Sequence, residues 1–191
     1  AEYVSSEDFI EEVEIERITL APSFGFAATD KTDILFRLGY NRIEQLEYAG
    51  LPSEVAGRPG VDPFQFTGAV DTPDTEIENL TIHSTVEHRF SDEITGTFQL
   101  RRFENSFREF ATSPFLEFFP LQGTSVPIIK GQLPVDTVEW TADASLTAEL
   151  ETGPVAHTIL AGLTWDDTNY QGATGFDLNP IALYDYVTET P

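Results

Sequence analysis

The sequence feature that most constrains the fold is a run of strict alternation between residues 138 and 150. Every even position in this run is apolar or small, and every odd position is polar. Side chains along a β-strand point alternately to opposite faces, so a period of two predicts a strand with one apolar and one polar face. The even positions are Val138, Trp140, Ala142, Ala144, Leu146, Ala148 and Leu150.

A second alternating run follows directly and predicts the other arm of a hairpin. Residues 151–154 include a glycine followed by a proline, which favour a tight turn, and mainly apolar residues then fall on odd positions from Val155 to Trp165. A four-residue turn would pair Leu150 with Val155 and Trp140 with Trp165. This register would place the apolar side chains of both arms on one face.

The length of this hairpin, predicted over about 137–168, points beyond an ordinary soluble sheet. Each arm holds about twelve residues, roughly twice the usual soluble strand, and a strand that crosses a bilayer needs about 9–11. Amphipathic aromatic rings gather at bilayer interfaces. We therefore predict Trp140, Trp165 and Tyr40 as membrane-interface aromatics.

Two earlier hairpins repeat the pattern, over about 9–47 and about 79–104. In the first, Phe24 and Phe26 fall opposite Phe36 and Ile34, and Pro22 predicts a bulge or an edge because proline cannot donate to a ladder. In the second, Ser91-Asp92-Glu93 forms the turn.

The connections between hairpins are long, and they complete the predicted architecture. Loops are expected over about 49–78 and about 112–136, with a C-terminal loop over 171–191. Short turns on one side and long loops on the other are typical of outer-membrane barrels. We predict a single all-β segment, a long antiparallel meander of about six strands in three hairpins, forming part of a transmembrane β-barrel.

Composition excludes several classes of function. The net charge is −23 with only ten Lys and Arg, which argues against nucleic-acid binding. The absence of cysteine removes thiol catalysis and thiolate metal sites. No nucleophile elbow, phosphate-binding loop or zinc-protease motif is present, so we predict no enzyme activity, no cofactor and no metal site.

Several short stretches are similar to one family, the TonB-dependent ferric-siderophore receptors. They are Glu16-Arg17, Ala21-Pro22-Ser23, Asp30-Lys31-Thr32, Glu87-His88-Arg89-Phe90, Leu150-Glu151-Thr152-Gly153-Pro154 with His157-Thr158 and Leu160-Ala161-Gly162, and Asp177-Leu178-Asn179-Pro180 with Tyr184. The resemblance implies import of ferric siderophores across the outer membrane of a Gram-negative bacterium, driven by TonB. It also implies a barrel of about twenty-two strands around a plug. This chain resembles a middle portion of such a barrel, without plug or TonB box.

The resemblance also suggests where a ligand would bind. Siderophore pockets in the family are lined by aromatic residues of outward loops, which points to Phe115, Phe118, Phe119 and Tyr170. The alternative is a small cluster that closes the loop over the strands. Arg101 near a strand end would meet an anionic chelate or a lipid headgroup, or else pair with an inward acid such as Glu87.

Two questions stay open at the level of sequence. The chain lacks methionine, so it is a processed product, a piece of a longer receptor, or a short natural relative. Its partners are then outer-membrane lipid and the remaining strands and plug, or other chains. The alternative function is a secreted or cell-surface all-β structural protein whose apolar faces pack between subunits.

Overall fold

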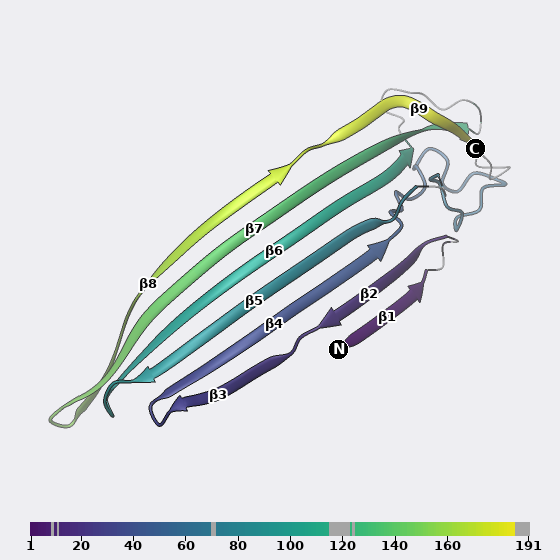
Figure 1. The fold of residues 1–191 in the computed structure, drawn as a ribbon. Coiled ribbons are helices and arrows are strands. Elements are labelled where there is room, and N and C mark those ends of the chain that lie inside the picture. The colour runs from purple at the N-terminus through teal and green to yellow at the C-terminus, as the bar shows by residue number, and fades with distance from the viewer. Residues whose placement is uncertain (9, 11, 70–71, 115–122, 124, 186–191) are drawn as a thin grey trace.

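The computed structural model is an all-β chain in which nine strands form one antiparallel sheet (Figure 1). The structure describes residues 1–8, 10, 12–69, 72–114, 123 and 125–185. The strands are β1 (Glu2–Glu7), β2 (Glu14–Leu20), β3 (Ser23–Thr29), β4 (Thr32–Gln45), β5 (Thr75–Arg89), β6 (Ile94–Pro114), β7 (Ser125–Thr152), β8 (Val155–Gly172) and β9 (Gly175–Asp185). Their order in the sheet is β1-β2-β4-β5-β6-β7-β8, while β3 also pairs with β4 and β9 also pairs with β7.

The three predicted hairpins are confirmed, and their short turns lie at the same end of the sheet. Figure 1 shows the β3/β4, β5/β6 and β7/β8 turns together at the lower left, which we call the turn end. The connection between β4 and β5 lies at the opposite end, which we call the loop end. The predicted arrangement of short turns on one side and long loops on the other is therefore present.

The described chain has nine strands where about six were predicted, because two long arms are interrupted at prolines and β1 is an additional strand. β2 and β3 pair with β4 in one unbroken register, and between them the Pro22 carbonyl accepts a hydrogen bond from the Leu38 amide at 3.0 Å. In an antiparallel ladder the amide and carbonyl of one residue point to the same neighbour. Proline supplies only the carbonyl, so the ladder opens there, as the sequence predicted.

β8 and β9 form the second interrupted arm, so the C-terminal loop predicted for 171–191 is wrong over 175–185. The register of β8 along β7 continues into β9, and the break at residues 173–174 lies opposite Pro134. The Pro134 carbonyl accepts from the Ala173 amide at 3.1 Å. The missing amide faces β8 and β9, so the pairing of β7 with β6 continues past it.

The loop predicted for 112–136 is also wrong at both ends. β6 extends to Pro114 and β7 begins at Ser125, and the two strands stay paired as far as Pro114 opposite Ile128. Alternation fades in this part because apolar side chains occur on both faces near the loop end. The predicted loop of 49–78 is shorter than expected, since β5 begins at Thr75. β1 was not predicted as a strand.

Registers test the predicted pairs directly. Phe24 opposite Phe36 and Phe26 opposite Ile34 are confirmed. The predicted β7/β8 register is wrong: each residue of β7 lies opposite a residue of β8 two positions further along than predicted. The turn has only two residues, Gly153 and Pro154, instead of four, and the φ of 62° at Gly153 suits such a turn. A shift of two preserves which face each side chain takes, so the predicted faces stand.

The shorter turn also separates the two tryptophans. Trp140 is opposite Asp167, and Trp165 is opposite Ala142. The two rings share a face, but they do not lie directly opposite each other, so the predicted pair of tryptophans is wrong.

Among the residues that the structure describes, the packed core lies at the loop end. Val55, Val126 and Ile128 are buried there, with Leu51 and Val61 packed against them, and we call these five residues the loop-end cluster. By contrast, every residue of β8 is exposed. The remainder of the sheet is a single layer, and no other described part of the chain covers either face.

Candidate functional site

The two faces of the sheet differ in chemistry, and this difference defines the candidate site. The apolar face carries the even-numbered residues of β2 to β7 and the odd-numbered residues of β8. The polar face carries the others. Large side chains of the apolar face stay exposed, among them Phe24 at 64%, Leu163 at 71% and Trp165 at 53%. Soluble monomers rarely expose a contiguous apolar surface of this extent.

The apolar band ends sharply toward the loop end. On β4 to β8 its last residues are Tyr40, Leu80, Leu100, Val138 and Trp165, with Trp140 next to Val138. The next residue on the same face of each strand is charged: Arg42, Glu78, Arg102, Asp136 and Asp167. A hydrophobic region thus gives way to a charged one within two residues on every one of these strands.

The boundary is irregular from strand to strand. The row of directly opposite residues that starts at Tyr40 runs through Leu80, Glu104 and Val138 to Asn169. The last apolar residues of β4, β5 and β7 lie on this row, whereas Leu100 on β6 and Trp165 on β8 lie four residues nearer the turn end.

The charged groups beyond the boundary are paired with one another. Arg42 contacts Glu44 and lies 3.7 Å from Glu78, which also accepts a hydrogen bond from the Tyr40 hydroxyl at 3.1 Å. Arg108 binds both oxygens of Asp136 at 2.8 Å.

A second pair lies against a tryptophan. Arg102 contacts Glu104 and lies 5.3 Å from the ring centre of Trp140, within range of a cation–π contact. Arg102 therefore lies level with the apolar side chains of Ile82 and Trp140 and is neutralised by Glu104.

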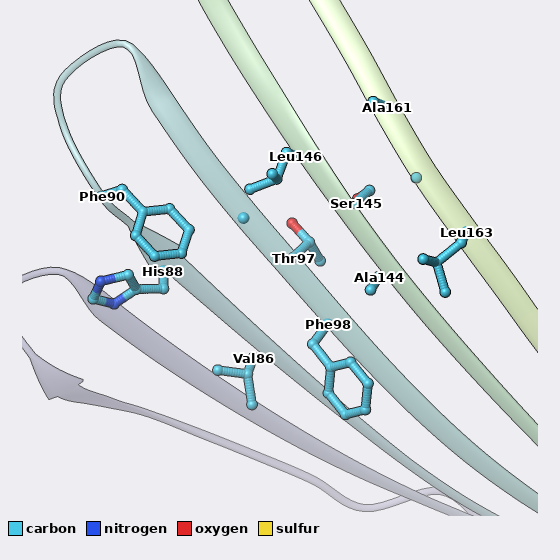
Figure 2. Close-up of a pocket in the computed structure, with 12 residues that line it drawn as sticks. Val86, His88, Phe90, Thr97, Phe98, Ala144, Ser145, Leu146, Ala161 and Leu163 are labelled. Atoms are coloured by element: carbon cyan, nitrogen blue, oxygen red, sulfur yellow. The ribbon is translucent and has the colours of Figure 1, made fainter.

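Near the turn end the apolar face has a hollow of about 530 Å³ (Figure 2). The bottom of the hollow is formed by the small residues Gly96, Ala144 and Ala161. Larger side chains, such as those of Phe98 and Leu163, form its sides. At its rim, the His88 ring lies edge-on to Phe90 at 4.7 Å, and His88 Nδ1 lies 2.8 Å from the Thr32 hydroxyl. The hollow is lined mainly by apolar atoms, so it suits a hydrocarbon chain and not a polar ligand.

The polar face is built of rows in which residues of successive strands lie directly opposite one another. An amide row, defined here as Asn41, Asn79 and Asn105, continues to Thr137 and Tyr170. Asn105 Nδ2 donates to Asn79 Oδ1 at 2.9 Å, and the Thr19 hydroxyl donates to Asn41 Oδ1 at 3.1 Å. One hydrogen bond joins β2 to β4 and the other joins β5 to β6.

A second row on this face carries two arginines on either side of a histidine. Arg37, His83 and Arg101 are direct neighbours on β4, β5 and β6, and we call them the basic row. Nearer the turn end, Asp33 and Glu87 lie opposite each other and form an acidic pair.

The predicted site residues fall in different places. Arg101 lies on the polar face and contacts Glu139, with the Thr141 hydroxyl at 3.4 Å, so its acidic partner is Glu139 and not Glu87. Tyr170 is 65% exposed on the same face. The two are two strands apart and four rows apart, so the structure does not bring them together. Phe115, Phe118 and Phe119 lie outside the described residues.

Arg37, His83 and the amide row were not predicted as site residues. His83 opposite Arg101 follows from the short β5/β6 turn, so the sequence contained that signal. The position of Arg37 opposite His83 depends on the β4/β5 register. The long connection between these strands does not fix that register at the level of sequence.

Within the described ranges, no three or more His, Asp and Glu side chains are arranged to hold a metal ion. Among these same residues, no helix has the length and apolar character needed to cross a membrane.

The backbone is similar to solved structures of bacterial receptors. FpvA of Pseudomonas aeruginosa, bound to a heterologous pyoverdine–iron complex, matches 97% of this chain with a TM-score of 0.82 and 17% identity. Fiu of Escherichia coli K12, a ferric-catecholate import receptor, matches 97% with a TM-score of 0.79 and 17% identity. BauA of Acinetobacter baumannii, the ferric preacinetobactin receptor, matches 97% with a TM-score of 0.74 and 12% identity.

These similarities concern the fold. The chain spans 25% of FpvA, 31% of Fiu and 28% of BauA. No protein-family model matches the sequence, and no curated protein matches it significantly. The structural neighbours are outer-membrane β-barrels, so the predicted fold class, a segment of such a barrel wall, is confirmed.

Proposed function

We propose that this chain is part of the barrel wall of a TonB-dependent receptor that imports ferric siderophores across the outer membrane of a Gram-negative bacterium. The observation that carries the proposal is the exposed apolar band, which ends in charged residues toward the loop end, on a single-layer sheet whose backbone matches such receptors over 97% of the chain. A one-layer sheet needs another medium or layer on each face. Lipid supplies it on the apolar face.

Each part of the chain then has a role. The apolar face contacts lipid, and Tyr40, Trp140 and Trp165 mark the outer interface, where amphipathic rings are favoured. The polar face lines the lumen beside the plug. The loop end, including Tyr170 at its edge, faces outward toward the siderophore. The protein acts in transport and not in catalysis, with TonB as its energy-coupling partner.

The edges of the sheet support a larger assembly. β3 pairs only with β4, and β8 pairs only with β7 along the described chain, so both strands have an unpaired edge. In a membrane every backbone amide and carbonyl needs a partner, which closed barrels provide. We propose that the remaining strands of the receptor pair with these edges.

Uptake of radioactive iron tests the function. Iron-starved cells carrying the gene are expected to accumulate iron from at least one ferric siderophore of a panel. Deleting the gene or dissipating the inner-membrane potential should abolish that uptake, and the gene on a plasmid should restore it. Uptake that is unchanged by deletion for every chelate would reject the proposal. Recovery of the native protein as a detergent-free oligomer would favour a secreted assembly protein instead.

A further inference from the structure

The hollow near the turn end of the apolar face is formed by neighbouring strands of this chain alone. Its lining comes from β5, β6, β7 and β8, which follow one another in the sheet. At about 4.8 Å between strands, the hollow extends about 14 Å across them. Strands that pair with the edges of the sheet would widen it sideways, so they would leave this face of the hollow open to the membrane.

A glycine allows an aromatic ring to form one side of the hollow. A Cβ atom on Gly96 would lie 2.7 Å from the Phe90 ring and 3.2 Å from the Leu146 side chain, so a larger residue there would displace both. The His88 ring lies edge-on to Phe90, and Figure 2 shows the two rings side by side at the β5 side of the hollow. His88 and Phe90 therefore form a packed rim.

His88 supplies a hydrogen-bond donor at this rim. The Thr29 hydroxyl donates to the Thr32 hydroxyl at 2.9 Å, so the Thr32 hydroxyl donates its own proton to His88 Nδ1, 2.8 Å away. Nε2 then carries the proton of the ring. No residue that the structure describes accepts a hydrogen bond from Nε2, whereas Nε2 of His83 lies 3.3 Å from Gln99 Oε1. An oxygen of a molecule seated in the hollow would complete the network.

The turns around the rim are acidic, and they restrict the charge of that molecule. Residues 30–33, 87–93 and 149–154 carry seven carboxylates against one lysine and one arginine. A purely anionic headgroup would be repelled there, whereas a headgroup with an ammonium group beside its phosphate would be attracted. The seven acids are Asp30, Asp33, Glu87, Asp92, Glu93, Glu149 and Glu151.

We propose that the hollow binds one acyl chain of a zwitterionic aminophospholipid in the periplasmic leaflet. The lipid phosphate accepts from His88 Nε2, and the ammonium group contacts the exposed carboxylates of Asp92 and Glu93, which directly follow the rim. Short turns of outer-membrane barrels face the periplasm, which places the rim at the level of the headgroups. The volume of about 530 Å³ is that of a pocket for one small ligand. This assignment rests on the proposed transport function and adds a specific lipid to it.

Lipid binding to the full-length receptor, delipidated in detergent and followed by native mass spectrometry, tests the site. The probes are phosphatidylethanolamine, phosphatidylglycerol and phosphatidylcholine with identical chains. We expect the wild type to bind one phosphatidylethanolamine about two- to fivefold more tightly than either of the others. Glycerophosphoethanolamine, which has the same headgroup without chains, should not displace it. Displacement by this soluble headgroup would overturn the role of the hollow.

Filling the hollow tests its part in binding the chain. Ala144→Leu adds a larger apolar side chain at the bottom of the hollow and should raise the Kd for phosphatidylethanolamine by about tenfold. The matched control is Ala148→Leu, which adds the same side chain on the same face of β7 but outside the hollow, and it should change the Kd by less than about twofold. An equal change in both variants would overturn the inference.

Two further variants test the headgroup contacts. His88→Phe keeps a ring beside Phe90 and should weaken all three phospholipids by about three- to tenfold, because the phosphate loses its donor. The control His157→Phe alters a histidine of the same face outside the hollow and should have no effect. Asp92→Asn/Glu93→Gln should abolish the preference for phosphatidylethanolamine over phosphatidylglycerol. A preference that survives this change would overturn the headgroup assignment.

The remaining outcomes separate this inference from the function. Equal affinity of the wild type for all three phospholipids, unchanged by Ala144→Leu, would overturn the inference and leave the transport function standing. Tighter binding of phosphatidylglycerol would do the same. Recovery of the native protein without detergent would count against the transport function itself.

Discussion

The loop end and the β8 edge of the same sheet are stabilised in opposite ways. At the loop end, residues 46–69 fold back on β6 and β7, and Val55 and Ile128 are completely buried. On β8, Ile159 and Leu160 remain 54% and 70% exposed. The loop end is stabilised by a packed protein interior. The β8 edge is stabilised by the hydrogen bonds of its backbone to β7 and by the surrounding medium.

Specific hydrogen bonds hold the connection at the loop end in place. The Tyr48 hydroxyl donates to the Gln65 carbonyl at 3.2 Å, and the Thr67 hydroxyl donates to the Gly50 carbonyl at 3.0 Å. The Ala69 amide donates to the Thr112 hydroxyl of β6 at 2.9 Å. This connection is therefore a packed structural unit anchored to the sheet. The comparison teaches that the loop end is stabilised by protein neighbours, whereas the proposed barrel wall would rely on lipid in their place.

The largest effect is expected from emptying the loop-end cluster. Ile128→Ala removes a fully buried side chain and leaves a cavity, at a cost of about 2–5 kcal/mol. The change should expose residues 46–69, seen as faster amide hydrogen exchange and proteolysis there. The matched control is Ile159→Ala, which should cost less than about 1 kcal/mol because lipid fills the space. Equal costs at the two positions would contradict the proposed difference between the regions.

A charge on the apolar face should cost slightly less and tests which face meets lipid. Ile159→Arg places a cation within the apolar band, at a cost of about 2–4 kcal/mol in a bilayer. Leu160→Arg is the control at nearly the same depth, because Leu160 takes the polar face opposite Thr147. Folding of the full-length receptor into lipid vesicles should be impaired only by the first change. Impairment by the second alone would invert the assignment of the faces.

The division between the faces was predictable from sequence, whereas distances along the strands were not. Alternation is local, so it gave the face of Trp140 and Leu146 correctly even though the β7/β8 register was wrong by two. Strand ends near the loop end escaped prediction because Val126 and Ile129 are both buried there, and a strand buried on both sides does not alternate.

The candidate site shows the same limit. Arg101 was singled out, but its neighbour Arg37 comes from the other side of a long connection. A single sequence does not fix the pairing of two strands so joined. The ion pair of Arg101 with Glu139 likewise depends on the β6/β7 register, which spans the connection between Pro114 and Ser125.

The smallest effect is expected from the hydroxyl of Tyr48, and it adds a pH dependence to the stability of the loop end. Burial, and secondarily the carboxylate of Asp8, raise the pKa of Tyr48 above its ordinary value. The folded form therefore holds its proton more tightly than the unfolded form. The resulting stability is fully present below the unfolded pKa of about 10, and it is lost as pH rises through the folded pKa.

Tyr48→Phe removes both this pH dependence and the hydrogen bond to Gln65. At neutral pH the change should cost about 0.5–1.5 kcal/mol, because the ring contact with Phe66 at 5.9 Å stays while the Gln65 carbonyl loses its donor. The measurement is amide hydrogen exchange of residues 46–69 from pH 8 to about 11, corrected for the intrinsic exchange rate at each pH. As the pH rises, the corrected exchange rate should increase more in the wild type than in the variant. Identical pH profiles would show that the Tyr48 hydroxyl is not buried by this connection. The loop end would then be less tightly packed than the buried loop-end cluster indicates, and the contrast with the exposed β8 edge would be smaller.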